Sequence, residues 1–343
     1  MNRITVKNLH FKNFTAFKDI QMEFSEGINI FIGENGTGKT HVLKALYAAC
    51  NITRKDISYN GSSFHEALIR VFAPLDERLG RLVRRRRGVD KAEIKISRTD
   101  AKIGIAFTPR EADTPKTQGL SDWTNVRMDC VMIPVQEMLS HSPGFMSLYQ
   151  DHRISFDSTY NDIIQRALIP LRRGAADTPR LKLLHKIRKA MEGTVQIKGE
   201  QFFLKDKHGV IEFSLVAEGL RKLGLIWVLI QNGTLQNNAV LLWDEPESNL
   251  NPKLARTVVE ILLELQRLGT QIFISTHDYN TLREFDIQRQ SGDKIVFHSL
   301  YRKDNDIKVN SSPIFLDIDP NTILETYTSL YDRAIEKAVG GSR

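Results

Sequence analysis

The segment GENGTGKT, Gly33–Thr40, has the residue types and spacing of a phosphate-binding loop, G-x-x-x-x-G-K-[ST]. Glycines let such a loop turn tightly, so that successive backbone N–H groups point inward at phosphate oxygens, and the positive end of the following helix adds to the attraction. We expect Lys39 to reach the β- and γ-phosphates and the Thr40 hydroxyl to bind Mg²⁺. The predicted binding residues are Gly33, Glu34, Asn35, Gly36, Thr37, Gly38, Lys39 and Thr40.

A second segment, AVLLWDEP at Ala239–Pro246, is an apolar run that ends in two acids. We expect the Asp244 carboxylate to hold Mg²⁺ against the phosphates, directly or through a water, and Glu245 to polarise the attacking water. Alone, two acids after a strand are also typical of a cap on the next helix. Paired with the glycine-rich loop, they predict a site that binds and hydrolyses ATP with Mg²⁺.

A third segment, the apolar IFIS, is followed by Thr276 and His277. The carboxyl end of a strand lies at the sheet edge where phosphates bind in open α/β sheets, so this position suits a sensor of the γ-phosphate. A lone histidine at a strand end is more often structural, but its order after the other two motifs favours the functional interpretation. The sequence therefore predicts Lys39, Glu245 and His277 as catalytic residues.

These residues need a sheet that brings several strand ends together. Ala239–Trp243 is continuously apolar, as expected of a strand covered by helices on both faces. Strands that alternate with helices predict an α/β fold with a mainly parallel sheet and an antiparallel N-terminal subsheet. The other predicted core elements are strands at Ile4–Leu9, Ile20–Phe24, Ile28–Ile32 and Gln271–Ser275, turns at Lys12–Asn13 and Glu26–Gly27, and helices at Lys39–Ala49, Glu218–Gln231 and Lys253–Leu268, with Gly269 as the last helix's C-terminal cap.

The middle of the chain, 52–205, is predicted to be an insertion into an ATPase core formed by 1–51 and 206–343. Its first part is basic and interrupted by loops, and its second part has the apolar spacing of a helical lobe. The elements predicted from here to the core are strands at Ala92–Ile96, Ile103–Phe107 and Cys130–Pro134, helices at Tyr160–Arg172 and Pro179–Met191 separated by GAADTP, a hairpin at Val195–Ile197 and Gln201–Leu204, and a strand at Val210–Phe213.

The composition is that of a globular protein: 343 residues, 41% hydrophobic and 26% charged, which is enough for a large core. No run approaches the ~20 apolar residues of a membrane helix, so we expect a cytoplasmic protein with no membrane partner. Cys50 and Cys130 show no metal-ligand spacing and are expected to be buried small apolar residues.

The formal charge of +7 is compatible with a polyanionic partner. Positive charge is densest in one run, which contains Arg78, Arg81, Arg84, Arg85, Arg86, Arg87 and Lys91. Two interpretations remain open for this run: a solvated loop or helix face, and a contact with nucleic acid or a partner, for which Arg81 and Arg84 to Arg87 are the candidates.

The order of GENGTGKT, VAEGLRKLG, LLWDEPESNLNP and FISTHD resembles the ABC-type ATPases. Within them it is similar to the RecF, SMC and OLD-like class, including small ATPases of bacterial anti-phage systems such as PARIS and Septu. The N-terminal pattern ITVKNLHFKNFTAFKDIQMEF looks like the same class. The resemblance covers about 1–50 and 210–280 and implies the fold of an ABC-ATPase head with an inserted helical lobe.

The resemblance also implies a head-to-tail homodimer, in which ATP on the loop of one copy is closed over by a signature helix of the other. Ala217, Glu218 and Gly219 occupy the signature position, where the family usually has serine in place of Ala217. A methyl group cannot donate the family's hydrogen bond, so closure is expected to rest on backbone N–H groups, the helix N-terminus and Arg221.

Three further positions match the family's pattern. Gln136 resembles the glutamine that joins the metal to the helical lobe, although Glu137 lies beside it. Ser248–Asn251 matches the segment that crosses the dimer interface. An adenine-stacking group is expected in the first strand and turn, at Asn13 or Phe14.

A second active site is not expected. Asp317-Ile318-Asp319 has the Asp-x-Asp form of the TOPRIM-type nuclease domains that follow some related ATPases, but too few residues come after His277 for such a domain. Asp319 before Pro320 is interpreted as a helix cap.

Three functions remain open. The first is an ATPase switch, set in anti-phage defence by the resemblance, in which ATP closes the dimer, hydrolysis opens it, and the geometry controls a separately encoded effector such as a nuclease or toxin. The second is a repair or recombination ATPase that binds DNA. The third is a scaffold that binds ATP only to assemble a higher homo-oligomer, against which Glu245 argues.

Overall fold

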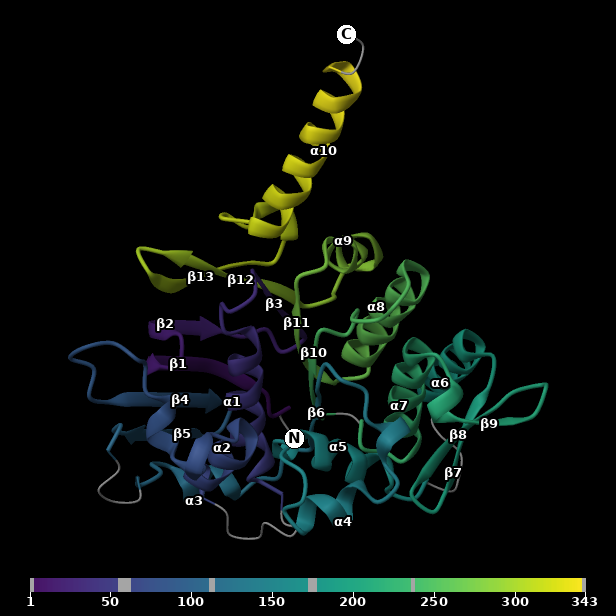
Figure 1. Cartoon of the computed structure of the whole chain (residues 1–343), viewed down its shortest axis with the longest axis horizontal. Coiled ribbons are helices and arrows are strands. Elements are labelled where there is room, and N and C mark those ends of the chain that lie inside the picture. Colours follow the sequence, from purple (N-terminus) through teal and green to yellow (C-terminus); the bar gives the residue numbers. More distant parts are fainter. Residues whose placement is uncertain (1–2, 55–62, 111–114, 172–177, 236–237, 341–343) are drawn as a thin grey trace.

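The computed structural model describes residues 3–54, 63–110, 115–171, 178–235 and 238–340 (Figure 1). The strands are β1 (Val6–Phe14), β2 (Phe17–Glu23), β3 (Ile28–Ile32), β4 (Ala92–Arg98), β5 (Lys102–Phe107), β6 (Cys130–Ile133), β7 (Thr194–Lys198), β8 (Gln201–Lys205), β9 (Val210–Glu212), β10 (Val240–Asp244), β11 (Gln271–Thr276), β12 (Ile295–Lys303) and β13 (Asp306–Ser312). The α-helices are α1 (Lys39–Asn51), α2 (Phe64–Phe72), α3 (Leu120–Thr124), α4 (Phe145–Gln150), α5 (Ser158–Ala167), α6 (Thr178–Met191), α7 (Glu218–Gln231), α8 (Pro252–Arg267), α9 (Tyr279–Gln288) and α10 (Thr322–Gly340).

A six-stranded sheet in the order β13-β12-β3-β11-β10-β6 forms the centre of the molecule. All neighbouring pairs are parallel except β12 with β13. Parallel strands put their carboxyl ends at one edge, so the residues that follow β3, β10 and β11 come together there. The predicted mainly parallel α/β sheet is confirmed.

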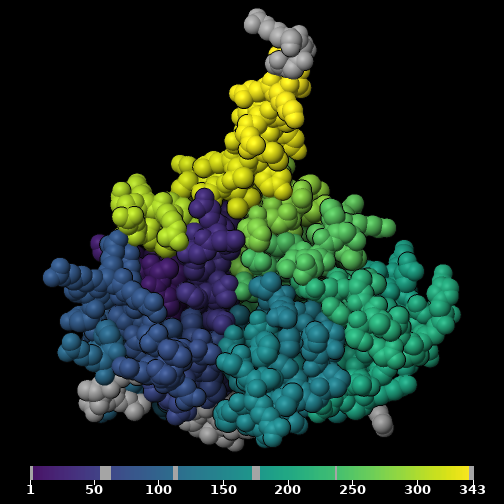
Figure 2. All heavy atoms as spheres, viewed as in Figure 1, coloured from purple at the N-terminus to yellow at the C-terminus, as the bar shows by residue number. Residues whose placement is uncertain are grey.

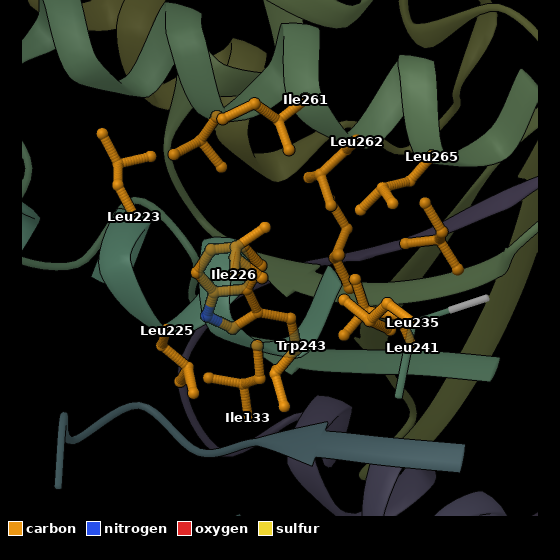
Figure 3. Packing of buried hydrophobic residues seen from close by; sticks show 14 of the residues in the cluster. Ile133, Leu223, Leu225, Ile226, Leu235, Leu241, Trp243, Ile261, Leu262 and Leu265 are labelled. Atoms are coloured by element: carbon orange, nitrogen blue, oxygen red, sulfur yellow. The ribbon is translucent and has the colours of Figure 1, made fainter. Parts of the chain in front are cut away.

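Alternate residues of β10 enter two different cores. Leu241 and Trp243 pack with α7 and α8 on one face (Figure 3), whereas Val240 and Leu242 pack with α1 and the N-terminal sheet on the other. Successive side chains of a strand point to opposite faces, so a strand covered on both sides must be apolar throughout, as this one is.

The N-terminal sheet has the order β2-β1-β4-β5 and is antiparallel. The predicted turn at Lys12–Asn13 is wrong, because β1 continues to Phe14 and the turn to β2 lies at Thr15–Ala16. The rings of Phe11, Phe14 and Phe17 cluster under the sheet, so burial of these phenylalanines extends the strands beyond the alternation that the sequence showed.

Segment 52–205 contributes to both central sheets. β4 pairs with β1, and β6 pairs with β10, so these strands lie within the core sheets, while α4 to α6, β7 and β8 lie to one side of them (Figure 1). The helix predicted to reach Arg172 ends at Ala167, and GAADTP falls largely outside the described residues. Whether 52–205 behaves as one inserted unit stays a prediction.

The helix cap predicted at Asp319 is wrong. α10 starts at Thr322, and the Asn321 side chain accepts the backbone N–H of Leu324 at 3.1 Å. Pro320 lacks a backbone N–H and ends the preceding segment, so the capping residue is the asparagine after it. The two cysteines are buried, as predicted. Among the described residues, no helix is long and apolar enough to span a membrane.

Candidate nucleotide-binding site

The phosphate-binding loop joins β3 to α1 and depends on glycine. Gly33, Gly36 and Gly38 have φ of 143°, 77° and 94°, in the region that side chains disfavour. A Cβ on Gly33 would lie 2.2 Å from the Leu300 carbonyl oxygen, and one on Gly38 would meet the Phe17 ring at 2.4 Å. Gly33 and Gly38 therefore require glycine for space as well as for backbone conformation.

Lys39 folds back over its own loop. Its ammonium donates to the carbonyl oxygens of Gly33 at 2.6 Å and Glu34 at 3.0 Å. Burial lowers its pKa, and the carboxylates of Glu245 and Asp244 act in the opposite direction. A phosphate placed in the loop would replace these two carbonyls as the partner of the Lys39 ammonium.

Thr40 and Asp244 meet at the sheet edge, as their motifs predict. The Thr40 hydroxyl donates to Asp244 Oδ2 at 2.8 Å, and the Ser275 hydroxyl donates to Asp244 Oδ1. Burial raises the pKa of Asp244. A buried carboxylate beside a hydroxyl is a donor set that suits a hard divalent cation, because the cation compensates the desolvated charge.

Glu245 lies one residue beyond Asp244 and faces His277. The carboxylate Oε1 and His277 Nδ1 are 3.1 Å apart. Glu245 has φ of 47°, which turns the chain sharply at the strand end, and its backbone N–H is held by the Ser275 carbonyl at 3.1 Å. The structure thus brings together the two residues that the sequence nominated from segments about thirty positions apart.

Glu247 is a residue that the sequence analysis missed. Its Oε1 accepts the Thr276 hydroxyl at 2.5 Å, and the same hydroxyl accepts the Asp278 N–H at 3.0 Å. Burial raises the pKa of Glu247 to about 7. Glu247 thereby fixes the chain on both sides of His277, and its place in the motif DEPE was the available signal.

The signature position lies at the N-terminus of α7. Ala217 is the N-cap and provides no side-chain hydrogen bond, as its methyl group dictates. A Cβ on Gly219 would approach Leu250 at 2.8 Å and Leu254 at 3.1 Å, so the glycine lets α7 pack closely on the segment after Asp244 and Glu245. The Glu218 carboxylate accepts from the Asn249 side chain at 3.0 Å.

Two basic side chains connect α7 to other site segments. Lys222 is buried and donates to the Ser248 carbonyl at 2.5 Å. Arg221 pairs with Glu137 at 2.8 Å, and burial raises the pKa of this carboxyl. Gln136 beside it is exposed, and within the described residues no hydrogen bond joins it to Thr40 or Asp244. Its expected contact with the metal stays a prediction.

The basic run is partly structural. Arg84 is buried and donates to Asp306 Oδ1 at 2.5 Å, and Arg86 pairs with the same carboxylate at 3.5 Å. Arg84 must therefore be removed from the candidate nucleic-acid contacts, because its charge is already neutralised inside the protein. Arg81, Arg85, Arg86 and Arg87 are exposed.

A cavity of about 440 Å³ lies beside the first turn of α1, with Thr15, Ala16, His41, Phe72 and the segment Arg81–Arg86 around it. Burial lowers the pKa of His41 to about 4, so its ring is neutral at pH 7. Among the described residues, His41 Nδ1 and the Thr15 hydroxyl are buried without a hydrogen-bond partner. These two polar groups suit a ligand with a flat ring and polar edges, such as adenine. Phe14, which the sequence offered as an adenine-stacking residue, cannot stack on such a ligand, because its own ring is fully buried.

The chain is similar to several known proteins. A family model described as "AAA domain, putative AbiEii toxin, Type IV TA system" matches residues 28–283. The DNA replication and repair protein RecF of Clostridium novyi is 30% identical over 157 residues, 44% of this chain and 38% of that protein. RecF of Clostridium beijerinckii is 28% identical over 119 residues, 31% of this chain and 32% of that protein. The chain thus spans about a third of the length of these curated relatives.

Two solved structures share the fold. A crystal structure of an SMC head bound to the C-winged helix domain of ScpA matches with a TM-score of 0.57 and 15% identity, over 90% of this chain and 97% of the other. An Smc head domain with an extended coiled coil from Pyrococcus furiosus, bound to the C-terminal domain of ScpA, matches with a TM-score of 0.55 and 11% identity, over 96% and 99%.

The central sheet, the glycine loop and the acidic strand end define an ABC-type P-loop ATPase of the RecF/SMC class. The family match covers most of the chain, and the chain belongs to the AAA-domain family named above.

Proposed function

We propose that the protein hydrolyses ATP as a head-to-tail homodimer and that the change between closed and open dimer controls a separately encoded effector. The observation that carries the first part is the convergence of Thr40, Asp244, Glu245 and His277 at one sheet edge. A site that only stored nucleotide would not need a carboxylate beside the predicted metal ligand. The third interpretation, a non-catalytic scaffold, is therefore disfavoured.

The residues at the loop fit ATP and Mg²⁺. Thr40 and Asp244 would hold the ion, which when bound would neutralise charge on the phosphates. Lys39 would leave its two carbonyl partners for the phosphates, and the neutral His41, the Thr15 hydroxyl and Phe72 would receive the adenine ring. Glu245 would accept a proton from the attacking water, with His277 holding the carboxylate in place.

The dimer is proposed because the site is half built in one copy. The loop, Asp244 and Glu245 form one half, whereas the N-terminus of α7 offers backbone N–H groups without a side-chain cap. Ser248–Asn251 is tied to the same helix end through Asn249 and Lys222. A movement of α7 on closure would reach Glu245 through this segment.

The two remaining interpretations differ in what the closed dimer binds: an effector protein in the first and DNA in the second. The effector interpretation is supported by the resemblance to defence ATPases, and the DNA interpretation by the RecF relatives and the exposed Arg81, Arg85, Arg86 and Arg87. We favour the effector because Arg84, at the centre of the basic run, is buried and paired with Asp306 within the chain. A cytoplasmic location belongs to the same proposal.

The test is to express the Glu245→Gln chain together with its neighbouring gene and to purify it with and without ATP. Co-purification of a protein, without nucleic acid, is the expected result. Retention of DNA only with ATP, at low salt and with no protein partner, would replace the effector interpretation with the repair interpretation.

A further inference from the structure

α10 extends away from the molecule as an arm. Figure 1 shows the helix rising from the edge formed by β12, β13 and α9, and in Figure 2 it stands above the rest of the surface. Ile323 is buried and Tyr327 is half-buried at its base, whereas every residue from Thr328 to Val339 is exposed. The base is therefore anchored, and the remainder touches little of its own chain.

The exposed part of the arm has an apolar face. Tyr331, Ile335 and Val339 recur every four residues, so their side chains lie on one side of the helix, and Leu330 lies about 100° from Tyr331 around the helix axis, at the border of this face. They are 65%, 61%, 74% and 54% exposed, respectively. A short helix is marginal in water unless an apolar face is covered, so this spacing indicates a surface that packs against a partner.

The base of the arm lies at the nucleotide edge of the sheet. The rings of Tyr327 and Tyr279 stack with centroids 4.4 Å apart, and Tyr279 comes two residues after His277. On the other side, the Ser299 hydroxyl donates to the Pro320 carbonyl at 2.8 Å, and Ser299 pairs with Ile32, the residue before the glycine loop. The arm thus starts between the segment after His277 and the phosphate-binding loop.

The occupant of this face follows from that position. In a head-to-tail dimer, the signature helix of the second copy must come to the nucleotide edge, beside His277. Leu215 lies four residues before Gly219 and is 70% exposed, so it would arrive together with the signature. Ile314 and Leu316, which precede α10 in the chain, are also exposed.

We propose that α10 is a dimerisation arm whose Tyr331–Ile335 face packs on a second copy of this chain, at the surface around Leu215. This inference rests on the proposed head-to-tail dimer. Among the described residues, the arm extends about 18 Å beyond Tyr327, which offers a short apolar face compared with the ~800 Å² per partner of a standard interface. It therefore adds affinity to the ATP-driven contact rather than holding two copies together alone.

The first experiment measures ATP-dependent dimerisation of the full chain in the Glu245→Gln background. We expect Tyr331→Ser with Ile335→Ser to weaken the dimer by at least about tenfold, because both side chains lose a buried apolar contact. The matched control is Arg333→Ser with Glu336→Ser on the opposite side of the same helix, which should dimerise like the parent. ATP binding by the monomer should be equal in all three, since none of these residues lines the nucleotide site.

The outcomes separate the two proposals. If the parent does not dimerise with ATP, the proposed function fails, and the arm with it. If the parent dimerises and the Tyr331/Ile335 variant does so equally well, the arm proposal alone fails. Loss of a co-purifying effector with unchanged dimerisation would assign the apolar face to that effector and overturn the proposal.

A cross-linking experiment tests the surface assigned on the second copy. Two preparations, Tyr331→Cys and Leu215→Cys, are mixed with ATP and a short bismaleimide; the natural Cys50 and Cys130 are buried. We expect a linked dimer only in the mixture. A link formed by Tyr331→Cys alone would mean that two arms pair with each other, and it would overturn the assignment to Leu215.

Discussion

The two ends of the nucleotide site are built differently. At the glycine-loop end, side chains within one copy satisfy one another: Lys39 on loop carbonyls, and Thr40 and Ser275 on Asp244. At the signature end, the N-cap of α7 is Ala217, which gives the helix no side-chain hydrogen bond. The first end is ready to bind in a single copy, whereas the second makes sense only against another copy. Substitutions at the two ends should therefore have separable effects.

The largest effect is expected for Lys39→Ala. The variant lacks the ammonium that is expected to pair with the negative charge of the phosphates, so ATP affinity should fall at least about a hundredfold. Titration calorimetry measures this directly. Because the lysine lies at the ready-built end, binding should be lost in the monomer as well as in the dimer. Unchanged affinity in Lys39→Ala would mean that nucleotide binds elsewhere.

Glu245→Gln should separate binding from hydrolysis. The amide keeps the shape of the side chain but cannot accept a proton, so turnover should fall by about 10²- to 10³-fold. ATP affinity should be retained, and the closed dimer should accumulate. Steady-state ATPase assays and sedimentation with ATP measure the two properties. A variant that resembles Lys39→Ala in both would refute the assigned roles.

Glu247→Gln should change how stability depends on pH. The pKa of Glu247 is about 7 in the folded protein, against an ordinary value of 4.5, so the folded state holds its proton more tightly than the unfolded state. This residue therefore lowers the free energy of unfolding as pH rises from about 4.5 to about 7, by about 3 kcal/mol. Glu247→Gln should remove this contribution to the pH dependence of the free energy of unfolding, which is measured by denaturant unfolding without nucleotide. If wild type and Glu247→Gln differ in unfolding free energy by the same amount at pH 4.5 and at pH 7, the raised pKa of Glu247 would be contradicted.

Ala217→Ser should produce the smallest effect and the opposite sign. A serine hydroxyl at the N-cap accepts a backbone N–H of the first turn, which stabilises the helix by about 1 kcal/mol. We expect a higher unfolding midpoint and an ATP-dependent dimer that is about fivefold tighter. Ala217→Val is the control, because it adds volume without an oxygen. If the serine and valine variants have the same unfolding midpoint and form equally strong dimers, the missing N-cap hydrogen bond would not limit stability or dimerisation.

The same contrast decides what the sequence could predict. The glycine loop, the apolar strand before Asp244 and the helix after Asn251 are continuous segments with strong local patterns, and the fold and the family match agree with them. Glu247 was missed because its role comes from Thr276, which only the parallel pairing of β10 with β11 brings near. Arg84 was misjudged because its partner Asp306 is more than two hundred residues away. The turn at Thr15–Ala16 was shifted because burial of Phe14, rather than alternation, sets the end of β1.

The most direct test of the account mixes two inactive variants, Lys39→Ala and Gly219→Asp. Each alone should hydrolyse ATP at a background rate, since the first lacks the loop end and the second adds a charged side chain where α7 packs closely. In a head-to-tail heterodimer, one of the two sites combines an intact loop with an intact signature. The account predicts that mixing restores about a quarter of the wild-type rate, because half of the randomly assorted dimers hold one such site. A mixture that stays as inactive as its components, while wild type is active, would contradict a site shared between two copies.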